Sequence, residues 1–124
     1  HRTISSGCVR ACHDLSEGGL GVAAAEMAFG GGFGLALRLA DVPRAADLKD
    51  DGRVLFSESN SRFLVEVAHD RTAEFEKAFA GLPCARIGEV TDTGRLIVTG
   101  LSGKRVVEAD VEALRAAWKR PLAW

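Results

Sequence analysis

Short apolar segments alternate with polar, glycine-rich turns along the chain, and the spacing of the apolar positions changes from one segment to the next. Where apolar side chains recur at every second position, the pattern predicts a strand, because successive side chains of a strand point to opposite faces. Where they recur every three or four positions, it predicts a helix with one buried face. The predicted strands cover residues 8–13, 34–39, 62–68, 84–91 and 95–99. The predicted helices cover residues 17–29, 71–81 and 110–119.

The order of these elements is β-α-β, a polar loop, and then β-α-β-β-α. Strands that alternate with helices, with one pair of adjacent strands, predict an α+β fold in which a mixed β-sheet has helices packed on it. The last two strands are expected to form a hairpin through the turn Thr91-Asp92-Thr93-Gly94. The chain has the length of one domain, so 1–124 is expected to be a single unit.

The helix predicted over 17–29 follows the first strand after a short polar turn. Asp14 or Ser16 can cap it, and Asp14 with Glu17 has the spacing of a capping box in which Asp replaces Ser or Thr. Such a cap contributes about 1 kcal/mol. The glycine run 30–34 follows the helix rather than preceding one, so it is interpreted as a helix stop and not as a phosphate loop.

Composition and charge narrow the possible functions. Apolar residues make up 47% of the chain and charged residues 27%, which allows a packed core and argues against disorder. The net charge is −1 and the basic residues are scattered, so the sequence gives no basic surface for nucleic acid. The apolar runs are too short for a membrane span, and the first residues do not resemble a signal peptide.

The three cysteines, Cys8, Cys12 and Cys84, contain no C-x-x-C pair. Their pattern favours three small buried apolar side chains over a metal site or a catalytic thiol. Unpaired thiols are typical of a reducing compartment, so the expected location is cytoplasmic.

The turn at residues 13–19 is the first candidate site. A glycine-rich turn that leads into a helix presents backbone N–H groups and the positive end of the helix dipole, which suit a phosphate. Its spacing matches neither G-x-G-x-x-G nor the G-K-[ST] phosphate loop. Asp14 is a possible hard oxygen ligand for Mg²⁺, and His13 a possible phosphate donor. The alternative is that Asp14 only caps the helix and His13 only packs at the strand end.

Six consecutive polar residues, 57–62, form the second candidate site between two apolar segments. Such dense hydrogen-bonding capacity just before a buried strand is costly to bury, which favours a role in binding. Glu58 could accept from ribose hydroxyls or a metal-bound water, and Ser59 and Asn60 could contact a polar substrate. Arg62 could pair with Glu58 or with a phosphate. The alternative is a solvated loop, and no residue is assigned a catalytic role because no Ser-His-Asp or Cys-His set can be assembled.

Several motifs follow one another in order, namely HDLSEGGL at 13–20, LFSESNSRF at 55–63 and IGEV at 87–90. Together they resemble the phosphoribosylformylglycinamidine synthase family. The resemblance is to the C-terminal domain of the synthetase subunit, a domain shared with aminoimidazole ribonucleotide synthetases. It covers nearly the whole chain, through the final helix.

The resemblance implies a ligase of purine biosynthesis that uses ATP and Mg²⁺. In this family, ATP and glutamine-derived ammonia convert formylglycinamide ribonucleotide into its amidine. The implied partners are upstream domains of the same polypeptide, a glutaminase subunit that supplies ammonia, and the ribonucleotide substrate. The chain starts at His1 without an initiator methionine, as expected of a domain excised from a longer protein, and such a domain would be inactive alone. Two alternatives stay open: another synthetase of the superfamily, or a non-catalytic packing or nucleotide-holding module.

The family carries two tandem copies of this architecture, and His13 in place of the glutamine of the first copy indicates the second copy. By resemblance, Asp14 matches the aspartate that ligates Mg²⁺ in the first copy. Asn60 matches a glutamine and is one methylene shorter. In the second copy the equivalent cleft is associated with a structural nucleotide. The resemblance therefore predicts nucleotide or substrate contacts, gathered in one cleft, at His13, Asp14, Ser16, Gly18, Gly19, Glu58, Ser59, Asn60 and Arg62.

Overall fold

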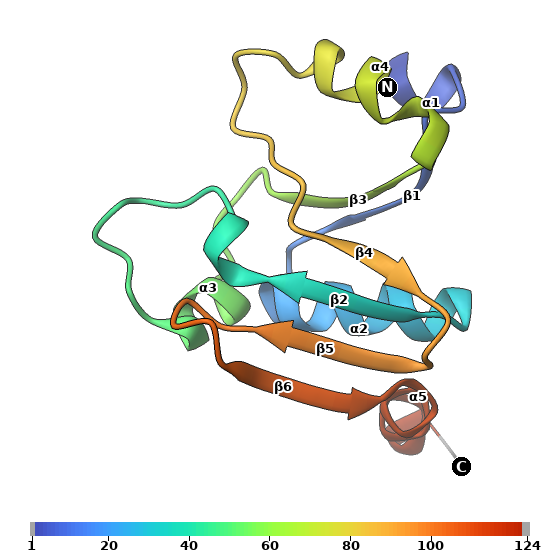
Figure 1. Cartoon of the computed structure of the whole chain (residues 1–124). Helices are drawn as coiled ribbons and strands as arrows, with labels where there is room; N and C mark the ends of the chain where they lie inside the picture. The colour runs from blue at the N-terminus through green and yellow to red at the C-terminus, as the bar shows by residue number, and fades with distance from the viewer. Residues whose placement is uncertain (1, 123–124) are drawn as a thin grey trace.

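One central helix, α2, contacts two separate β-sheets (Figure 1). The computed structural model describes residues 2–122. Its strands are β1 (Val9–Asp14), β2 (Gly34–Arg38), β3 (Phe63–Val67), β4 (Gly88–Thr91), β5 (Arg95–Thr99) and β6 (Arg105–Asp110). Its helices are α1 (Arg2–Ser5), α2 (Gly19–Gly31), α3 (Asp51–Phe56), α4 (Thr72–Ala78) and α5 (Val111–Lys119). Short 3-10 turns lie at Leu39–Asp41, His69–Arg71 and Arg120–Leu122.

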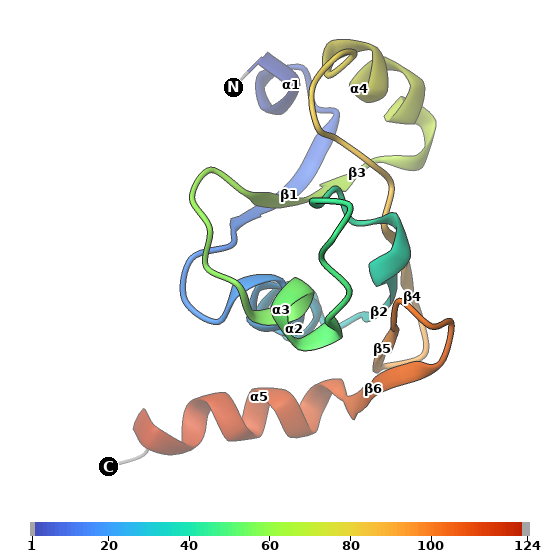
Figure 2. The ribbon, with the colours of Figure 1, turned by 90° about the vertical axis from the view of Figure 1, so that its left-hand side faces the viewer.

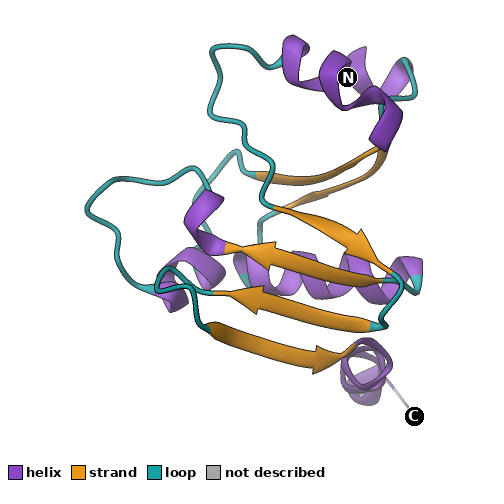
Figure 3. Cartoon of the chain, viewed as in Figure 1, coloured by secondary structure: helices purple, strands orange, loops and turns teal. Residues whose placement is uncertain are grey.

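The larger sheet has the strand order β4-β2-β5-β6 (Figure 3). Strands β2 and β5 run parallel, whereas β2–β4 and β5–β6 are antiparallel pairs. The sheet is therefore mixed and has helices packed on it, which confirms the predicted α+β class. Every strand and helix expected from the hydrophobic pattern is present, with ends shifted by a few residues.

The predicted hairpin of β4 and β5 is wrong. Strand β2 lies between them, so that Leu35 pairs with Val90 on one side and with Leu96 on the other. Gly34 makes this insertion possible at the point where β4 turns into β5. A Cβ on Gly34 would lie 2.5 Å from Thr91 Oγ1 and 2.7 Å from the Arg95 carbonyl oxygen. Local turn signals do not report a third strand that arrives from elsewhere in the chain.

The core lies between α2 and the four-stranded sheet, as the end-on view of α2 shows (Figure 2). Small side chains on α2, among them Ala23 and Ala24, let the helix approach the sheet closely. Leu37 from β2 and Val98 from β5 meet this face and are almost fully buried. Helix α5 packs against α2 on another side.

The smaller sheet joins β1 and β3 in antiparallel pairing, with Asp14 opposite Phe63. Helices α1 and α4 lie beyond its outer end (Figure 1). Phe75 of α4 is buried there and stacks on Phe79, with ring centroids 4.6 Å apart. Cys8 is fully buried, but Cys12 and Cys84 are exposed, so the expectation of three buried cysteines holds for Cys8 alone.

Helices α1 and α3 and strand β6 were not expected from the sequence. Helix α3 begins after Asp50, whose carboxylate accepts from the Arg53 backbone N–H at 2.7 Å and so forms an N-cap. Strand β6 forms the edge of the four-stranded sheet. Its charged residues, which include Arg105 and Glu108, are typical of an edge strand and hide the apolar alternation.

Candidate functional site

The fold brings the two candidate segments, 13–19 and 57–62, side by side. The Leu15 backbone N–H donates to the Arg62 carbonyl oxygen at 2.9 Å, which extends the β1–β3 pairing into the turn. The Gly18 backbone N–H donates to Glu58 Oε1 at 2.8 Å, across 40 positions of sequence. The expected proximity of these segments is therefore built into the backbone.

The predicted capping box at the start of α2 is wrong. The N-cap residue is Gly18, in a left-handed conformation with φ 76°, and no side chain caps the helix locally. Asp14 and Ser16 lie too early in the turn for this role, because α2 begins only at Gly19. The Glu58 carboxylate instead supplies the negative charge at the positive end of α2. One amide that the sequence offers to a bound anion is thus already engaged by this chain.

Gly19 fixes the position of α2 against the C-terminal end of α3. A Cβ on Gly19 would lie 2.7 Å from the Ser57 carbonyl oxygen and 2.8 Å from that of Leu55. The start of α2 therefore faces the end of α3 at close range, so that the positive end of one helix meets the negative end of the other. No residue larger than glycine fits there without displacing backbone.

The polar side chains of the segment 57–62 make two separate sets of contacts, one within the segment and one with the turn 13–19. The Arg62 guanidinium donates to the Ser57 carbonyl oxygen at 3.1 Å, to Ser57 Oγ at 3.0 Å and to Ser59 Oγ at 3.4 Å. Glu58, between the two serines, reaches the turn at Gly18 instead. Arg62 therefore takes serine partners, and Asn60 is exposed near the tip of the loop. The single shared cleft stays a prediction.

Asp14 is an open carboxylate of the turn, with 61% of its side chain exposed, and Glu17 is a second exposed one. A hydrogen bond from the Ser16 side chain holds the pKa of Asp14 below its ordinary value, so the group is ionised at neutral pH. An ionised, accessible carboxylate fits one position in a Mg²⁺ shell, with phosphate oxygens and water supplying the others. Within residues 2–122, no three His, Cys, Asp or Glu side chains are grouped to hold a metal by themselves.

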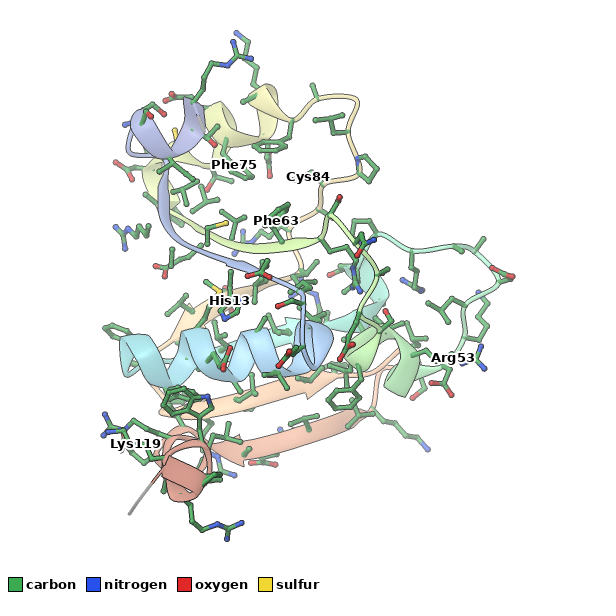
Figure 4. All side chains as sticks on the ribbon, turned by 180° about the vertical axis from the view of Figure 1, so that it is seen from behind. His13, Arg53, Phe63, Phe75, Cys84 and Lys119 are labelled. Atoms are coloured by element: carbon green, nitrogen blue, oxygen red, sulfur yellow. The ribbon has the colours of Figure 1, made fainter. Side chains whose placement is uncertain are left out.

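His13 points away from the open turn and toward α2 (Figure 4). Its Nδ1 lies 2.7 Å from the Asp14 carbonyl oxygen and its Nε2 lies 2.7 Å from Glu26 Oε2. Both partners are acceptors, so the arrangement is satisfied by a protonated imidazole that donates from both nitrogens. The expected role of His13 as a phosphate donor finds no support in this orientation.

Glu26 also joins α2 to α5, a connection that the sequence did not reveal. Trp118 Nε1 donates to Glu26 Oε1 at 3.0 Å, and the Trp118 ring packs on Phe29 with centroids 5.7 Å apart. Glu26 is the single charged residue of α2. A lone charge in such an apolar helix could have indicated that Glu26 has specific polar partners. His13, Glu26 and Trp118 therefore link the first strand to the last helix.

We expect this network to make stability depend on pH. The pKa of His13 is raised, mainly by its hydrogen bond to the Asp14 carbonyl and then by Glu26, against the opposing effect of burial. A raised folded-state pKa stabilises the domain below the ordinary value of about 6.5, and this contribution is lost as pH rises through the raised pKa. The free energy of unfolding of the parent chain should therefore fall as pH rises from about 6.5 through the raised pKa of His13. Denaturant titrations at a series of pH values should show this fall in the parent chain and not in His13→Gln.

Two variants control this experiment. Exposed His69→Gln should retain the pH dependence of the parent chain. Glu26→Gln removes the negative partner but keeps an amide oxygen for Trp118, so it should weaken the pH dependence without releasing α5. An unchanged profile in His13→Gln would show that the hydrogen bonds of His13 are not coupled to folding.

None of the helices in the described part of the chain combines the length and the apolar character needed to cross a bilayer.

The comparisons with known proteins agree with this architecture. Residues 2–100 match the family described as AIR synthase related protein, C-terminal domain. Thermotoga maritima PurL complexed with ATP is similar with a TM-score of 0.79 and 24% identity, over 91% of this chain and 20% of that chain. T. maritima PurL complexed with FGAR gives a TM-score of 0.78 and 27% identity, over 91% and 19%. Phosphoribosylformylglycinamidine synthase II from T. maritima gives 0.77 and 27%, over 91% and 20%.

The chain thus spans about a fifth of the length of these solved proteins. The family match, in contrast, extends over most of the chain and includes both candidate segments. The chain therefore belongs to the family of AIR synthase related proteins, as their C-terminal domain.

Proposed function

We propose that the chain is the C-terminal domain of an ATP-dependent phosphoribosylformylglycinamidine synthase. In the full polypeptide, formylglycinamide ribonucleotide, ATP and ammonia from a glutaminase subunit would give the amidine, ADP and phosphate. The observation that carries the proposal is the contact between the turn 13–19 and the segment 57–62, the two motifs of the family resemblance. The similarity to PurL structures supports it.

The residues of this chain would serve by positioning and by charge rather than as a nucleophile. Mg²⁺, when bound, would neutralise charge on phosphate oxygens, and Asp14 would be its ligand from this domain. Glu58 holds the turn at Gly18, and the pairing of β1 with β3 places Asp14 opposite Phe63 at the start of that turn. Residues that bind the rest of the nucleotide would come from the neighbouring domain.

We assign the domain to the second of the two tandem copies, because His13 replaces the glutamine typical of the first. In this domain the His13 ring lies between the Asp14 carbonyl oxygen and Glu26, which leaves neither ring nitrogen free for a ligand. A cleft of this copy would hold a nucleotide that stabilises the protein. The cytoplasm is the proposed location, where the substrate, ATP and Mg²⁺ are available.

The full polypeptide tests this function directly. Purified protein, supplied with an ammonium salt in place of the glutaminase subunit, should hydrolyse ATP only when formylglycinamide ribonucleotide is present. The amidine should form in equal amount to ADP. Phosphate release that responds instead to a different ribonucleotide would assign the chain to another synthetase of the superfamily, and no turnover with any ribonucleotide would favour a packing module.

A further inference from the structure

A small cavity lies between the loop that follows β2 and the segment that precedes β3. Its volume is about 170 Å³, and its wall includes Pro43, Arg44, Leu48, Val54, Ser57 and Arg62. The cavity takes Ser57, Ser59 and Arg62 from the segment 57–62 of the candidate site but no residue from the turn 13–19, so it lies on the side of that segment away from the turn. Two guanidinium groups and the serine hydroxyls give it a cationic, hydrogen-bonding interior.

The two arginines of this cavity combine partial burial with the lack of a carboxylate partner, whereas the other unpaired arginines of the described chain, Arg2, Arg53 and Arg120, are exposed. Seven arginines form ion pairs with carboxylates on the surface. Arg44 and Arg62 are partly buried, and within residues 2–122 no carboxylate pairs with either of them. Burial of a cation without a counter-charge is costly, so two such groups at one cavity leave room for an anion to stabilise both.

Both guanidinium groups keep donors available. Arg44 Nη1 donates to the carbonyl oxygens of Leu39, Ala40 and Val42, which fixes the side chain along the loop. Arg62 Nη1 donates to the serines of the segment 57–59. In both residues the described hydrogen bonds leave Nη2 without a protein acceptor. A pre-positioned guanidinium loses little side-chain freedom when it binds an oxyanion.

We propose that this cavity binds a phosphoryl group, either as inorganic phosphate or as the end of a small phosphomonoester. Arg44 and Arg62 donate to its oxygens from two sides, and the serine hydroxyls complete the shell. The cavity has the volume of about five or six water molecules at ~30 Å³ each, which suits a tetrahedral oxyanion. It is smaller than the roughly 300–1,000 Å³ of pockets that enclose whole drug-sized ligands, which favours a small anion over a whole nucleoside.

The site would connect two loops that share no sheet. The loop 42–48 carries Arg44 and the segment 57–62 carries Arg62, and a bound oxyanion would join them. The Ser57 carbonyl oxygen also lies close to Gly19 at the start of α2. An anion bound to Arg62 and the serines would therefore stabilise the position of the segment 57–62 beside the turn. This inference does not depend on the proposed synthetase reaction, since the cavity is formed by this chain alone.

The test is a titration of the chain with inorganic phosphate at constant ionic strength, with NMR detection of arginine Nε–H and backbone N–H signals. We expect saturable shifts at Arg44, at Arg62 and in the segment 57–59. Arg62→Gln should weaken binding about tenfold, the usual effect of one lost charge-assisted hydrogen bond. Arg53→Gln is the matched control, because Arg53 is exposed on α3 and does not line the cavity.

The outcomes distinguish free phosphate from an esterified phosphoryl group, and both from arginines that only hold the loops together. Equal binding of methyl phosphate would indicate that an esterified phosphoryl group enters, and preference for inorganic phosphate would indicate the free ion. Shifts that chloride reproduces, or equal weakening in Arg53→Gln, would overturn the proposal and leave the arginines as loop clamps. If Arg62→Gln fails to fold, Arg44→Gln decides by the same measurement.

Discussion

Replacing Gly19 by alanine is expected to destabilise the domain by about 2–5 kcal/mol. Two costs add at this position. The backbone of Gly19 has φ 59°, a left-handed conformation that an L-side chain disfavours. The new methyl group would also overlap the carbonyl oxygens of Ser57 and Leu55, which belong to backbone and cannot rotate away. Chemical denaturation of the two proteins would measure the difference.

Gly32→Ala is the matched control for this substitution. Gly32 ends the same helix with φ 72°, but nothing lies within 4 Å of the position that a Cβ would take there. It should therefore cost only the conformational penalty, about 1 kcal/mol. Equal losses in the two variants would show that the contact between α2 and α3 does not resist displacement, and that the start of α2 is not fixed as the structure indicates.

The Gly19 variant should also disturb the turn itself. If the methyl group pushes α2 away from α3, the Gly18 N–H moves from Glu58, with which it forms a 2.8 Å hydrogen bond. Hydrogen exchange at Gly18 should then become faster, whereas exchange in the β2–β5 pairing should change only with global stability. The comparison separates a local opening of the turn from a general loss of the fold.

Local patterns in the sequence predicted the elements well and their partners poorly. Alternation over 34–39 and 95–99 identified β2 and β5, because half-buried strands carry a period-two signal. The same signal cannot tell which strands are neighbours, and the insertion of β2 between β4 and β5 depends on contacts far apart in sequence. Helix α3 was missed because its start at Asp50 has the composition of a loop.

The candidate site shows the same division. Family resemblance predicted that the turn at 13–19 lies near the segment 57–62, and the bond between Gly18 and Glu58 joins them. Helix capping, in contrast, was expected from Asp14 or Ser16, because local spacing favours a nearby side chain. The acceptor at the start of the helix is Glu58, which lies 40 positions away in the sequence. Capping rules consider only neighbouring residues and could not identify it. Likewise, the interaction of His13 with Glu26 could not be predicted without knowing how β1 lies against α2.

In the full polypeptide, Asp14→Asn is expected to weaken the affinity for nucleotide by about 10–100-fold, the usual effect of losing one interaction with a charged ligand, so that less nucleotide co-purifies. Asparagine keeps the shape of the side chain but removes the negative charge that would hold Mg²⁺ beside the phosphates. Nucleotide released from desalted protein, measured at several Mg²⁺ concentrations, gives the result. Asp92→Asn, exposed in the turn between β4 and β5, is the control.

This variant also distinguishes ligation from a structural role of Asp14. The carboxylate does not cap α2 and is exposed, so Asp14→Asn should leave the 124-residue chain folded, with any loss of stability limited to the interactions of Asp14 with Ser16 and His13. Loss of nucleotide with unchanged stability would therefore place Asp14 in the binding shell. Full retention of nucleotide at low Mg²⁺ would exclude it, and the open turn would then serve the contact between domains.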